Sequence, residues 1–224
     1  MGSPYQDLHQ IYEADDPRAC GYRSRTAFIK ECAVIHEWVG ARTGNLLDVG
    51  CGSGLVSAPL LGAGWSVTGI DRDPVACARA EVRGLLTVEG DAAEMPFAEE
   101  TFDQVLCIEF LQQFNAPLAA VMVAEMGRVL KRGGRLIAAW RFGTSPMRRA
   151  VTFSGYVSRG FKRPFIKVHN HGWDQIESLA RTASLSLVRS ATIFPPLGLV
   201  MHDVHTLPAR CLGTSYLGLF QKTA

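Results

Sequence analysis

Short apolar runs recur along the chain, and they alternate with segments in which apolar residues recur every three or four positions. The first pattern is typical of strands buried on both faces, and the second is typical of amphipathic helices. Their alternation favours a largely parallel sheet covered by helices. Seven runs are predicted to form its strands, at residues 45–50, 65–71, 85–90, 102–110, 133–140, 185–194 and 215–222.

Helices are predicted between these runs, at about residues 55–63, 74–83, 117–130 and 173–182. Pro74 supports the second of them, because proline is favoured in the first turn of a helix. A further helix is predicted before the first strand, through Trp38. We expect its stripe of side chains at helical spacing to pack on the sheet, namely Phe28, Ile29, Cys32, Ile35, His36 and Val39.

The composition indicates one globular domain in a reducing compartment. The chain has 224 residues, 47% of them hydrophobic, which suffices for one sizeable core. Its six cysteines form no Cys-x-x-Cys pair, so we expect neither a disulfide framework nor a metal site. No signal peptide or apolar span is visible, and the net charge of +2 is not that of a nucleic-acid-binding domain. A cytoplasmic protein without a nucleic-acid partner is therefore expected.

The stretch LLDVGCGSGL, residues 46–55, places three glycines directly behind the first predicted strand. Gly50, Gly52 and Gly54 are spaced G-x-G-x-G, whereas a dinucleotide fingerprint requires G-x-G-x-x-G and would need a glycine where Leu55 stands. No G-K-[ST] sequence closes the run, so it is not a phosphate loop of the Walker type either.

This stretch resembles the first motif of class I S-adenosylmethionine-dependent methyltransferases, and in particular the small-molecule type that includes quinone O-methyltransferases. Four further segments resemble the later motifs of that family in order and spacing. The resemblance extends over about residues 45–140, and the segments that carry it are VTGIDRDP, VEGDAAEMPF, FDQVLCIEFLQQF and RVLKRGGRLIAAW.

The resemblance implies a doubly wound, Rossmann-like α/β fold. Its sheet would have seven strands, mostly parallel, with an antiparallel last strand and helices on both faces. The whole chain would be one domain with four parts. These are an N-terminal helical cap, a cofactor-binding core, an insertion that covers the acceptor, and a C-terminal helix with strands, at residues 1–44, 45–140, 141–172 and 173–224.

The resemblance also implies which residues hold the cofactor. Asp71 would accept hydrogen bonds from the ribose hydroxyls, Asp91 would accept one from the adenine amino group, and Ala92 would offer its backbone N–H to the ring. The full implied set is Asp48, Gly50, Cys51, Gly52, Gly54, Asp71, Arg72, Asp91, Ala92 and Cys107.

The two aspartates support this ligand on physical grounds. Asp48 and Asp71 end parallel strands, at the sheet edge where open α/β sheets bind ligands. Carboxylates suit a cationic ligand that carries hydroxyl groups, and they repel the pyrophosphate of a dinucleotide. S-adenosylmethionine has a sulfonium, an ammonium and a ribose diol.

The sequence offers three candidate catalytic residues, which are Glu109, His169 and His171. In the resembled family the fourth strand often ends in E-x-L-E-H. Here Gln112 and Gln113 replace its second Glu and its His, so no metal site is predicted. Each candidate has an alternative role: Glu109 as a helix cap and the histidines as structural groups. A polar cluster of His202, Asp203 and His205 is interpreted as a solvated loop.

Residues 141–167 carry seven Lys or Arg and no acid, interleaved with aromatic residues. They follow the fifth predicted strand, where the family commonly inserts a substrate-covering cap. One interpretation is a cap with a solvated basic face. Others are an entrance for an amphipathic, lipid-like or anionic acceptor, and a surface that touches anionic membrane. A further one is contact with single-stranded RNA, since basic and aromatic residues also suit stacking on bases.

The sequence therefore predicts an S-adenosylmethionine-dependent methyltransferase that acts on a small hydrophobic acceptor and releases S-adenosylhomocysteine. O-methylation is favoured because it is common in the resembled type. Three alternatives stay open: a nicotinamide-dependent dehydrogenase, an enzyme that uses the same cofactor for another transfer, and a non-catalytic cofactor-binding protein. The acceptor and the oligomeric state do not follow from the sequence.

Overall fold

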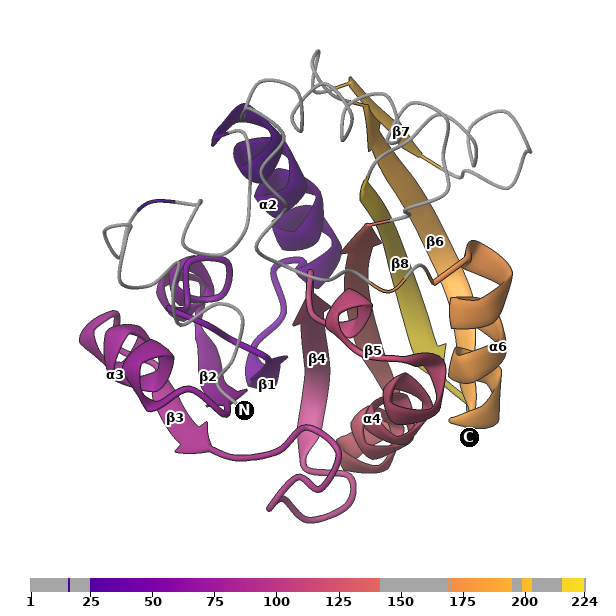
Figure 1. The fold of residues 1–224 in the computed structure, drawn as a ribbon. Coiled ribbons are helices and arrows are strands. Elements are labelled where there is room, and N and C mark those ends of the chain that lie inside the picture. The colour runs from indigo at the N-terminus through magenta and orange to yellow at the C-terminus, as the bar shows by residue number, and fades with distance from the viewer. Residues whose placement is uncertain are drawn as a thin grey trace, which may run out of the picture.

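The apolar runs pair side by side in one eight-stranded sheet, as seen in a computed structural model of the protein (Figure 1). The structure describes residues 16, 25–141, 169, 171–194, 199–202 and 215–223. The strands are β1 (Gly44–Val49), β2 (Trp65–Asp71), β3 (Leu86–Glu89), β4 (Phe102–Ile108), β5 (Leu130–Arg141), β6 (Leu185–Phe194), β7 (Leu199–His202) and β8 (Ser215–Lys222).

The sheet order is β3-β2-β1-β4-β5-β8-β6-β7. The pairs from β3 to β5 are all parallel, whereas β8 is antiparallel to both β5 and β6. This confirms the predicted Rossmann-like α/β class, including the antiparallel last strand. The predicted number of seven strands was wrong, because β7 pairs with the end of β6 as an eighth. The strand character of β7 depends on its pairing with β6, which the sequence pattern does not reveal.

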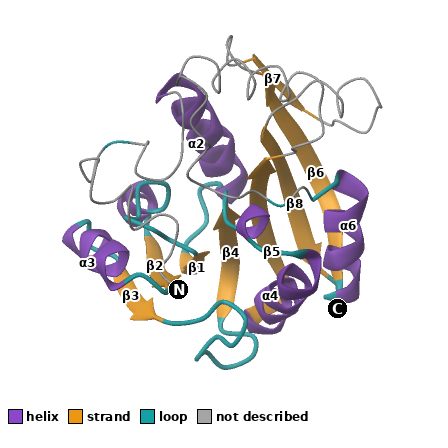
Figure 2. Cartoon of the chain, in the orientation of Figure 1, coloured by secondary structure: helices purple, strands orange, loops and turns teal. Residues whose placement is uncertain are grey.

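The helices are α2 (Arg25–Val39), α3 (Pro74–Val82), α4 (Ala116–Val129) and α6 (Trp173–Thr182), with short 3₁₀ helices η2 (Ala58–Ala63) and η3 (Leu111–Gln113) (Figure 2). The predictions of α3, α4 and α6 are confirmed. The Asp73 and Asn115 side chains cap α3 and α4 by accepting hydrogen bonds from the backbone N–H groups of Val75 and Leu118. Such caps satisfy the donors that a helix start leaves unpaired.

Two helix predictions need correction. The segment predicted as a helix at 55–63 forms turns and then the 3₁₀ helix η2, which ends at Gly64 in the left-handed conformation. Pro59 lacks an N–H group for an α-helical hydrogen bond, which favours this shorter form. In α2 the buried face consists mainly of Val34, Ile35, Trp38 and Val39, whereas Ile29 of the predicted stripe is 54% exposed.

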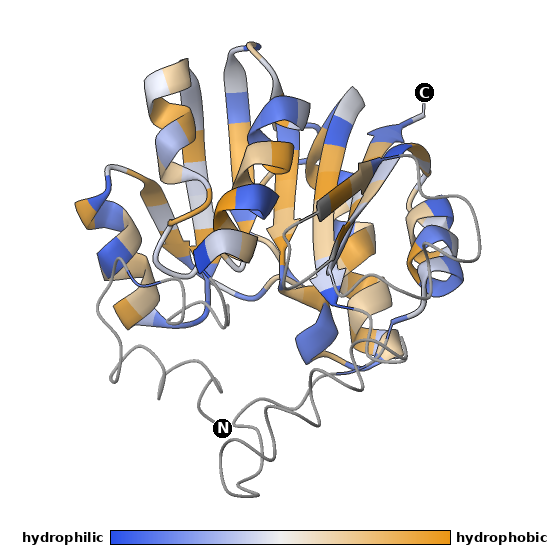
Figure 3. Cartoon of the chain, turned by 90° about the horizontal axis from the view of Figure 1, so that it is seen from above, coloured by the Kyte–Doolittle hydropathy of each residue, from blue (hydrophilic) through white to orange (hydrophobic). Residues whose placement is uncertain are grey.

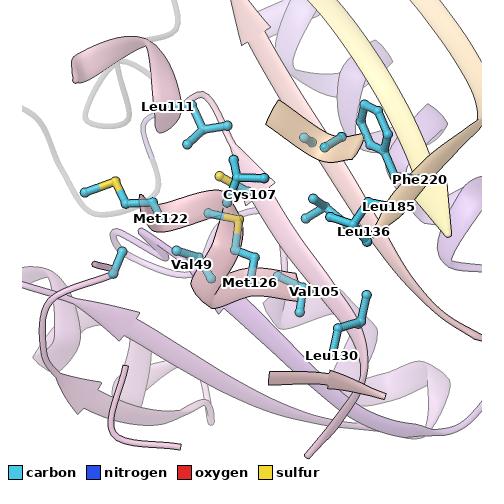
Figure 4. Close-up of a cluster of buried hydrophobic side chains, with 14 of the residues drawn as sticks. Val49, Val105, Cys107, Leu111, Met122, Met126, Leu130, Leu136, Leu185 and Phe220 are labelled. Carbon is cyan, nitrogen blue, oxygen red and sulfur yellow. The ribbon is translucent and has the colours of Figure 1, made fainter. Parts of the chain in front are cut away.

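Helices cover both faces of the sheet, and each face has its own core. On one face α4 and α6 lie side by side, and Met122, Met126 and Ile176 pack with strand residues such as Val105 (Figures 1 and 4). On the other face the core is formed by side chains of α2, η2 and α3. Hydrophobic residues are concentrated along the strands between these layers (Figure 3).

No helix among the described residues is both long and apolar enough to cross a membrane. The predicted insertion falls almost entirely on residues 142–168, which lie outside the described residues, as do Asp203 and His205. The division of the chain into four parts therefore stays a prediction.

Candidate functional site

The glycine loop after β1 folds back onto the end of β2. Gly50, Gly52 and Gly54 have φ angles of 69°, 52° and 74°, which glycine adopts without strain. The N–H groups of Gly50 and Cys51 donate to the Ile70 carbonyl at 2.8 and 3.2 Å, and that of Gly54 donates to the Cys51 carbonyl at 2.9 Å. These N–H groups therefore bond within the protein and do not converge on an external anion.

Gly50 is required by a close neighbour as well as by its φ angle. A Cβ atom at this position would lie 2.2 Å from Cδ2 of Phe110, so only glycine leaves room for the ring. Phe110 follows β4, and its ring packs edge-on against Phe114 with 4.9 Å between the centroids. The glycine loop is thus in contact with the segment that carries the candidate residue Glu109.

Asp71 ends β2 and faces the glycine loop. Its Oδ2 accepts a hydrogen bond from the Gly52 N–H at 2.9 Å, and its Oδ1 accepts one from the Asp73 N–H at 3.0 Å. The carboxylate is therefore held between the loop and the start of α3. A carboxylate oxygen can accept more than one hydrogen bond, so this orientation still allows a hydroxyl ligand.

Asp91 lies after the neighbouring strand β3 and opens a tight turn. Its Oδ1 accepts a hydrogen bond from the Ala93 N–H at 2.9 Å, and Glu94 N–H donates to its carbonyl at 3.1 Å. Arg72 approaches its Oδ2 at 3.8 Å, with 66% of the arginine side chain exposed. Ala92 is buried in the core cluster.

Asp48 is buried near the end of β1, next to the glycine loop. Burial raises the pKa of Asp48 to about 6; the Ser57 hydroxyl opposes this shift and the negative charge of Asp71 adds to it. The buried Cys107 follows Leu106, the β4 residue opposite Asp48. Burial, and then the charge of Asp48, raise the pKa of the Cys107 thiol.

Cys51 lies in the glycine loop beside Cys77 of α3, a neighbour that the sequence did not indicate. Hydrogen bonding with Cys77, burial and the nearby carboxylates raise the pKa of the Cys51 thiol. Both side chains are free cysteines. Since the thiolate is the nucleophilic form, these raised pKa values favour the neutral thiols of Cys51 and Cys107 next to the candidate cofactor site.

Glu109 follows β4 in an unusual environment. Its φ angle is 55°, which is uncommon for a residue with a side chain, and the residue is 4% exposed. Its Oε2 forms an ion pair with Nε of Arg141 and accepts a hydrogen bond from Nε2 of Gln112 at 2.7 Å. Its Oε1 is buried and has no hydrogen-bond partner in the part of the chain that the structure describes.

Gln112 connects three segments around this carboxylate. Besides its bond to Glu109, its Oε1 accepts a hydrogen bond from the Arg141 N–H at 3.1 Å, and its carbonyl accepts one from the His169 N–H at 2.6 Å. The roles of Gln112 and Arg141 did not follow from the sequence. The signal was present only as the replacement of a family acid by Gln112, three residues after Glu109.

His171 is buried against the 3₁₀ helix η3. Its Nε2 lies 3.1 Å from the Leu111 carbonyl oxygen and 2.9 Å from that of Phe114. Both partners are acceptors, so Nε2 carries the proton and donates to them. The structure thus brings His171 and Glu109 to the same segment, residues 109–114, with His171 bound to its backbone. His202 lies apart and exposed on β7.

Within the described residues, no group of three His, Cys, Asp or Glu side chains could hold a metal ion. In particular, the position of the family's second acid is Gln112, and the Glu109 carboxylate is compensated by Arg141. The donor set of this region therefore supplies charge pairing and hydrogen bonds.

Comparison with known proteins agrees with this geometry. Residues 47–138 match the sequence profile of a family described as methyltransferase domain. The ubiquinone biosynthesis O-methyltransferase of Pseudomonas fluorescens is 35% identical over 112 residues, which are 46% of this chain and 46% of that protein. The phosphatidylethanolamine N-methyltransferase of Cereibacter sphaeroides is 38% identical over 112 residues, 46% of this chain and 54% of that protein. The chain thus spans about half the length of the curated relatives it matches.

A solved structure extends the likeness beyond the matched core. The 1,6-didemethyltoxoflavin-N1-methyltransferase of Burkholderia thailandensis, solved with its acceptor and S-adenosylhomocysteine, aligns with 100% of this chain and 92% of its own. The TM-score is 0.66 at 19% identity, which shows the fold alone. Together, the profile match and the sheet order show that residues 47–138 resemble the methyltransferase-domain family and that the chain has the Rossmann-like fold of its solved neighbours.

Proposed function

We propose that the protein binds S-adenosylmethionine at the carboxyl edge of β1, β2 and β3 and transfers its methyl group to a small acceptor. The observation that carries this proposal is the Asp71 carboxylate, which is held by the N–H groups of Gly52 and Asp73. A carboxylate oriented in this way is suited to the two hydroxyls of a ribose.

The glycine loop argues against a phosphate-bearing ligand. Dinucleotide and nucleotide loops direct their N–H groups at phosphate oxygens, because these groups form an anion site. Here the N–H of Gly52 is bonded to a carboxylate, and those of Gly50 and Cys51 to a carbonyl. The loop therefore favours S-adenosylmethionine over a nicotinamide dinucleotide.

The charges of the edge fit the proposed cofactor. Asp48 and Asp71 are both acids, and the ligand would bring a sulfonium and an ammonium. A cation next to Asp48 would favour its ionised form and so offset the cost of burying that charge. The bound cofactor would supply a methyl group that is already activated for transfer. The task of the protein would then be to orient an acceptor and exclude water.

On the acceptor side we propose Glu109 as the residue that receives a hydrogen bond from the acceptor. Its Oε1 has no partner among the described residues, while Gln112 and Arg141 fix the other oxygen. This arrangement supports O-methylation, since an acceptor hydroxyl needs a group to take its proton. His171 is the second candidate: its Nε2 donates to two carbonyls, and its buried Nδ1, which can accept a proton, has no partner among the described residues.

A lipid-like or anionic acceptor, with contact of residues 141–167 to anionic membrane, stays part of the proposal. Its support is the basic and aromatic composition of that segment. Sedimentation with vesicles tests it: binding to anionic but not to neutral vesicles is expected, and binding to neither would favour a soluble acceptor.

Calorimetry tests the cofactor. We expect S-adenosylhomocysteine to bind and NADH not to bind. Asp71→Asn should weaken the binding of S-adenosylhomocysteine by about 1–3 kcal/mol, because the ribose hydroxyls would lose a charged acceptor. Asp103→Asn is the matched control, since Asp103 is a partly exposed acid at the opposite end of β4 that bonds to Asn45 and Lys131. Tight NADH binding without a response to the adenosyl ligand would overturn the proposal.

Transfer itself is tested with methyl-labelled cofactor and a panel of phenols, alcohols and amines. Label is expected in a hydroxyl-bearing acceptor, and Glu109→Gln is expected to reduce the turnover while leaving S-adenosylhomocysteine affinity unchanged. If the label were found only in amines, N-methylation would replace O-methylation in the proposal. A Glu109→Gln variant with full turnover would remove Glu109 from the acceptor side.

A further inference from the structure

An ion pair near the end of α4 lies outside the proposed site but reaches toward it. Glu125 and Arg128 are three residues apart, and Nε and Nη2 of Arg128 donate to the two carboxylate oxygens of Glu125 at 2.7 and 2.8 Å. This is the bidentate geometry that makes arginine–carboxylate pairs strong and specific. The Arg128 side chain is 30% exposed and the Glu125 side chain 20%, so solvent screens this ion pair less than it would a fully exposed pair.

The same two side chains hold the backbone of a distant segment. The Met95 N–H donates to Oε2 of Glu125 at 2.9 Å, while Arg128 donates to the Met95 carbonyl at 3.1 Å and to the Phe97 carbonyl at 2.8 Å. The pair therefore bonds to three backbone groups within three residues. All of these bonds connect parts of the chain that are 30 to 33 residues apart.

The held segment directly follows the turn that contains Asp91. That turn is closed by bonds from the Ala93 and Glu94 N–H groups to Asp91, and Met95 is the next residue. Met95 is also buried in the core, so the segment has little freedom to move independently of α4. Any displacement at Met95 would pass to Asp91 through a short, internally bonded turn.

We infer that Glu125 and Arg128 are positioning residues for adenine recognition, holding the Asp91 turn in the orientation that accepts the adenine amino group. The inference rests on the proposed cofactor site and deepens it, since it assigns base selectivity to a pair that does not touch the ligand. A bonded carboxylate and guanidinium remain ionised over the working pH range, because the Arg128 hydrogen bond lowers the pKa of Glu125 and the Glu125 carboxylate raises that of Arg128.

The test compares two ligands that differ at one group of the base. S-adenosylhomocysteine carries the 6-amino donor, and S-inosylhomocysteine carries a carbonyl oxygen in its place. Wild type should prefer the adenosyl ligand by about tenfold to a hundredfold, the range expected for one charge-assisted hydrogen bond. Arg128→Met should reduce this ratio by at least about tenfold. It should change the affinity for the inosyl ligand much less.

Two further variants separate positioning from mere folding. Arg132→Met is the matched control, because Arg132 forms an exposed ion pair with Glu100 and touches no backbone of the turn. It should leave both affinities unchanged. Arg128→Lys keeps the charge but cannot form all four bonds, so an intermediate ratio is expected. Glu125→Gln keeps the shape and should also lower the ratio if Arg128→Met fails to fold.

The outcomes are distinguishable. A variant of Arg128 or Glu125 that lowers thermal stability but keeps the wild-type ratio would overturn the inference and leave the pair a purely structural one. An equal loss of affinity for both ligands would overturn it as well. Failure of wild type to bind S-adenosylhomocysteine at all would overturn the proposed function, whatever the variants do.

Discussion

Two carboxylates at one sheet edge differ in what stabilises them. Asp71 accepts hydrogen bonds from two backbone N–H groups, which hold its carboxylate between the glycine loop and the start of α3. Asp48 is buried, and its pKa is raised to about 6. An ionised Asp48 is therefore unfavourable in the free protein and becomes favourable when a cation binds beside it.

The pH dependence of cofactor binding should reveal Asp48. A cationic ligand binds best to the ionised acid, so affinity for S-adenosylmethionine should rise between pH 5 and pH 7, through the pKa of about 6, and level off above it. Calorimetry across this range measures the effect. Asp48→Asn should bind more weakly at pH 7.5 and lose the rise between pH 5 and pH 7. A wild-type affinity that is flat over this range would contradict a role for Asp48 in binding.

The stability of the free protein should change in the opposite direction. The pKa of Asp48 is raised on folding, so the folded state binds the proton more tightly and loses stability as pH rises from about 4 to above 6. The shift from 3.8 to about 6 corresponds to roughly 3 kcal/mol. Asp48→Asn should therefore be more stable than wild type at pH 7.5, by up to that amount, with the difference vanishing towards pH 4. Urea unfolding at both pH values measures it.

At the scale of elements, α3 and α4 begin with the same kind of N-cap, but only one of the two caps lies at the candidate site. α3 and α4 each have an acid or amide cap that accepts from the backbone, with a proline in the first turn. Only the cap of α3 lies at the candidate site, because the N–H of Asp73 also donates to Asp71. The start of α4 is therefore structural, whereas the start of α3 also holds the carboxylate of the proposed ribose site.

Removing either cap should separate these purposes. Asp73→Ala and Asn115→Ala should each lower the free energy of unfolding by about 1 kcal/mol, as is typical for a lost N-cap. Only Asp73→Ala should weaken the binding of S-adenosylhomocysteine. Without its cap, the start of α3 would no longer keep the N–H of residue 73 in position to donate to Asp71. Unfolding curves and calorimetry on the two variants measure both quantities. Equal affinity in the two variants would show that the α3 cap does not orient Asp71.

Most elements could be predicted from the sequence, because their apolar runs, caps and prolines act locally. β7 could not, since its four residues become a strand only through pairing with β6. The position of Asp48, Asp71 and the three glycines at the ends of β1 and β2 was predictable, because the strand patterns and the glycine motif are local in the sequence. The roles of Gln112, Arg141 and Arg128 were not, because each depends on contacts with residues about 30 positions away.

At the scale of the molecule, the parallel and antiparallel parts of the sheet share a core through α4 and α6. Gly127 of α4 lies close to the end of α6: a Cβ atom there would lie 2.8 Å from the carbonyl oxygen of Ala183, just after α6. Contacts this short force a shift of backbone. The absence of a side chain at Gly127 therefore sets how closely the two helices approach.

Gly127→Ala should destabilise the protein although alanine favours helices. We expect a net loss of up to about 2 kcal/mol, from an overpacking cost of about 1–3 kcal/mol less a helix gain of about 1 kcal/mol. Gly62→Ala is the control, because nothing lies within 4 Å of its Cβ position. Thermal unfolding of both variants measures the difference. A Gly127→Ala variant that is more stable than wild type would show that the two helices separate at little cost.

The sheet order has a consequence for synthesis. β8 lies between β5 and β6, so the β6–β7 hairpin has no strand partner in the rest of the sheet until residues 215–222 are made. A nascent chain on the ribosome can assemble β1 to β5 early, but it must keep the apolar edges of β5 and β6 from pairing wrongly until β8 emerges. A chaperone would therefore matter most in the interval between the synthesis of β7 and that of β8, and not while the cofactor edge forms.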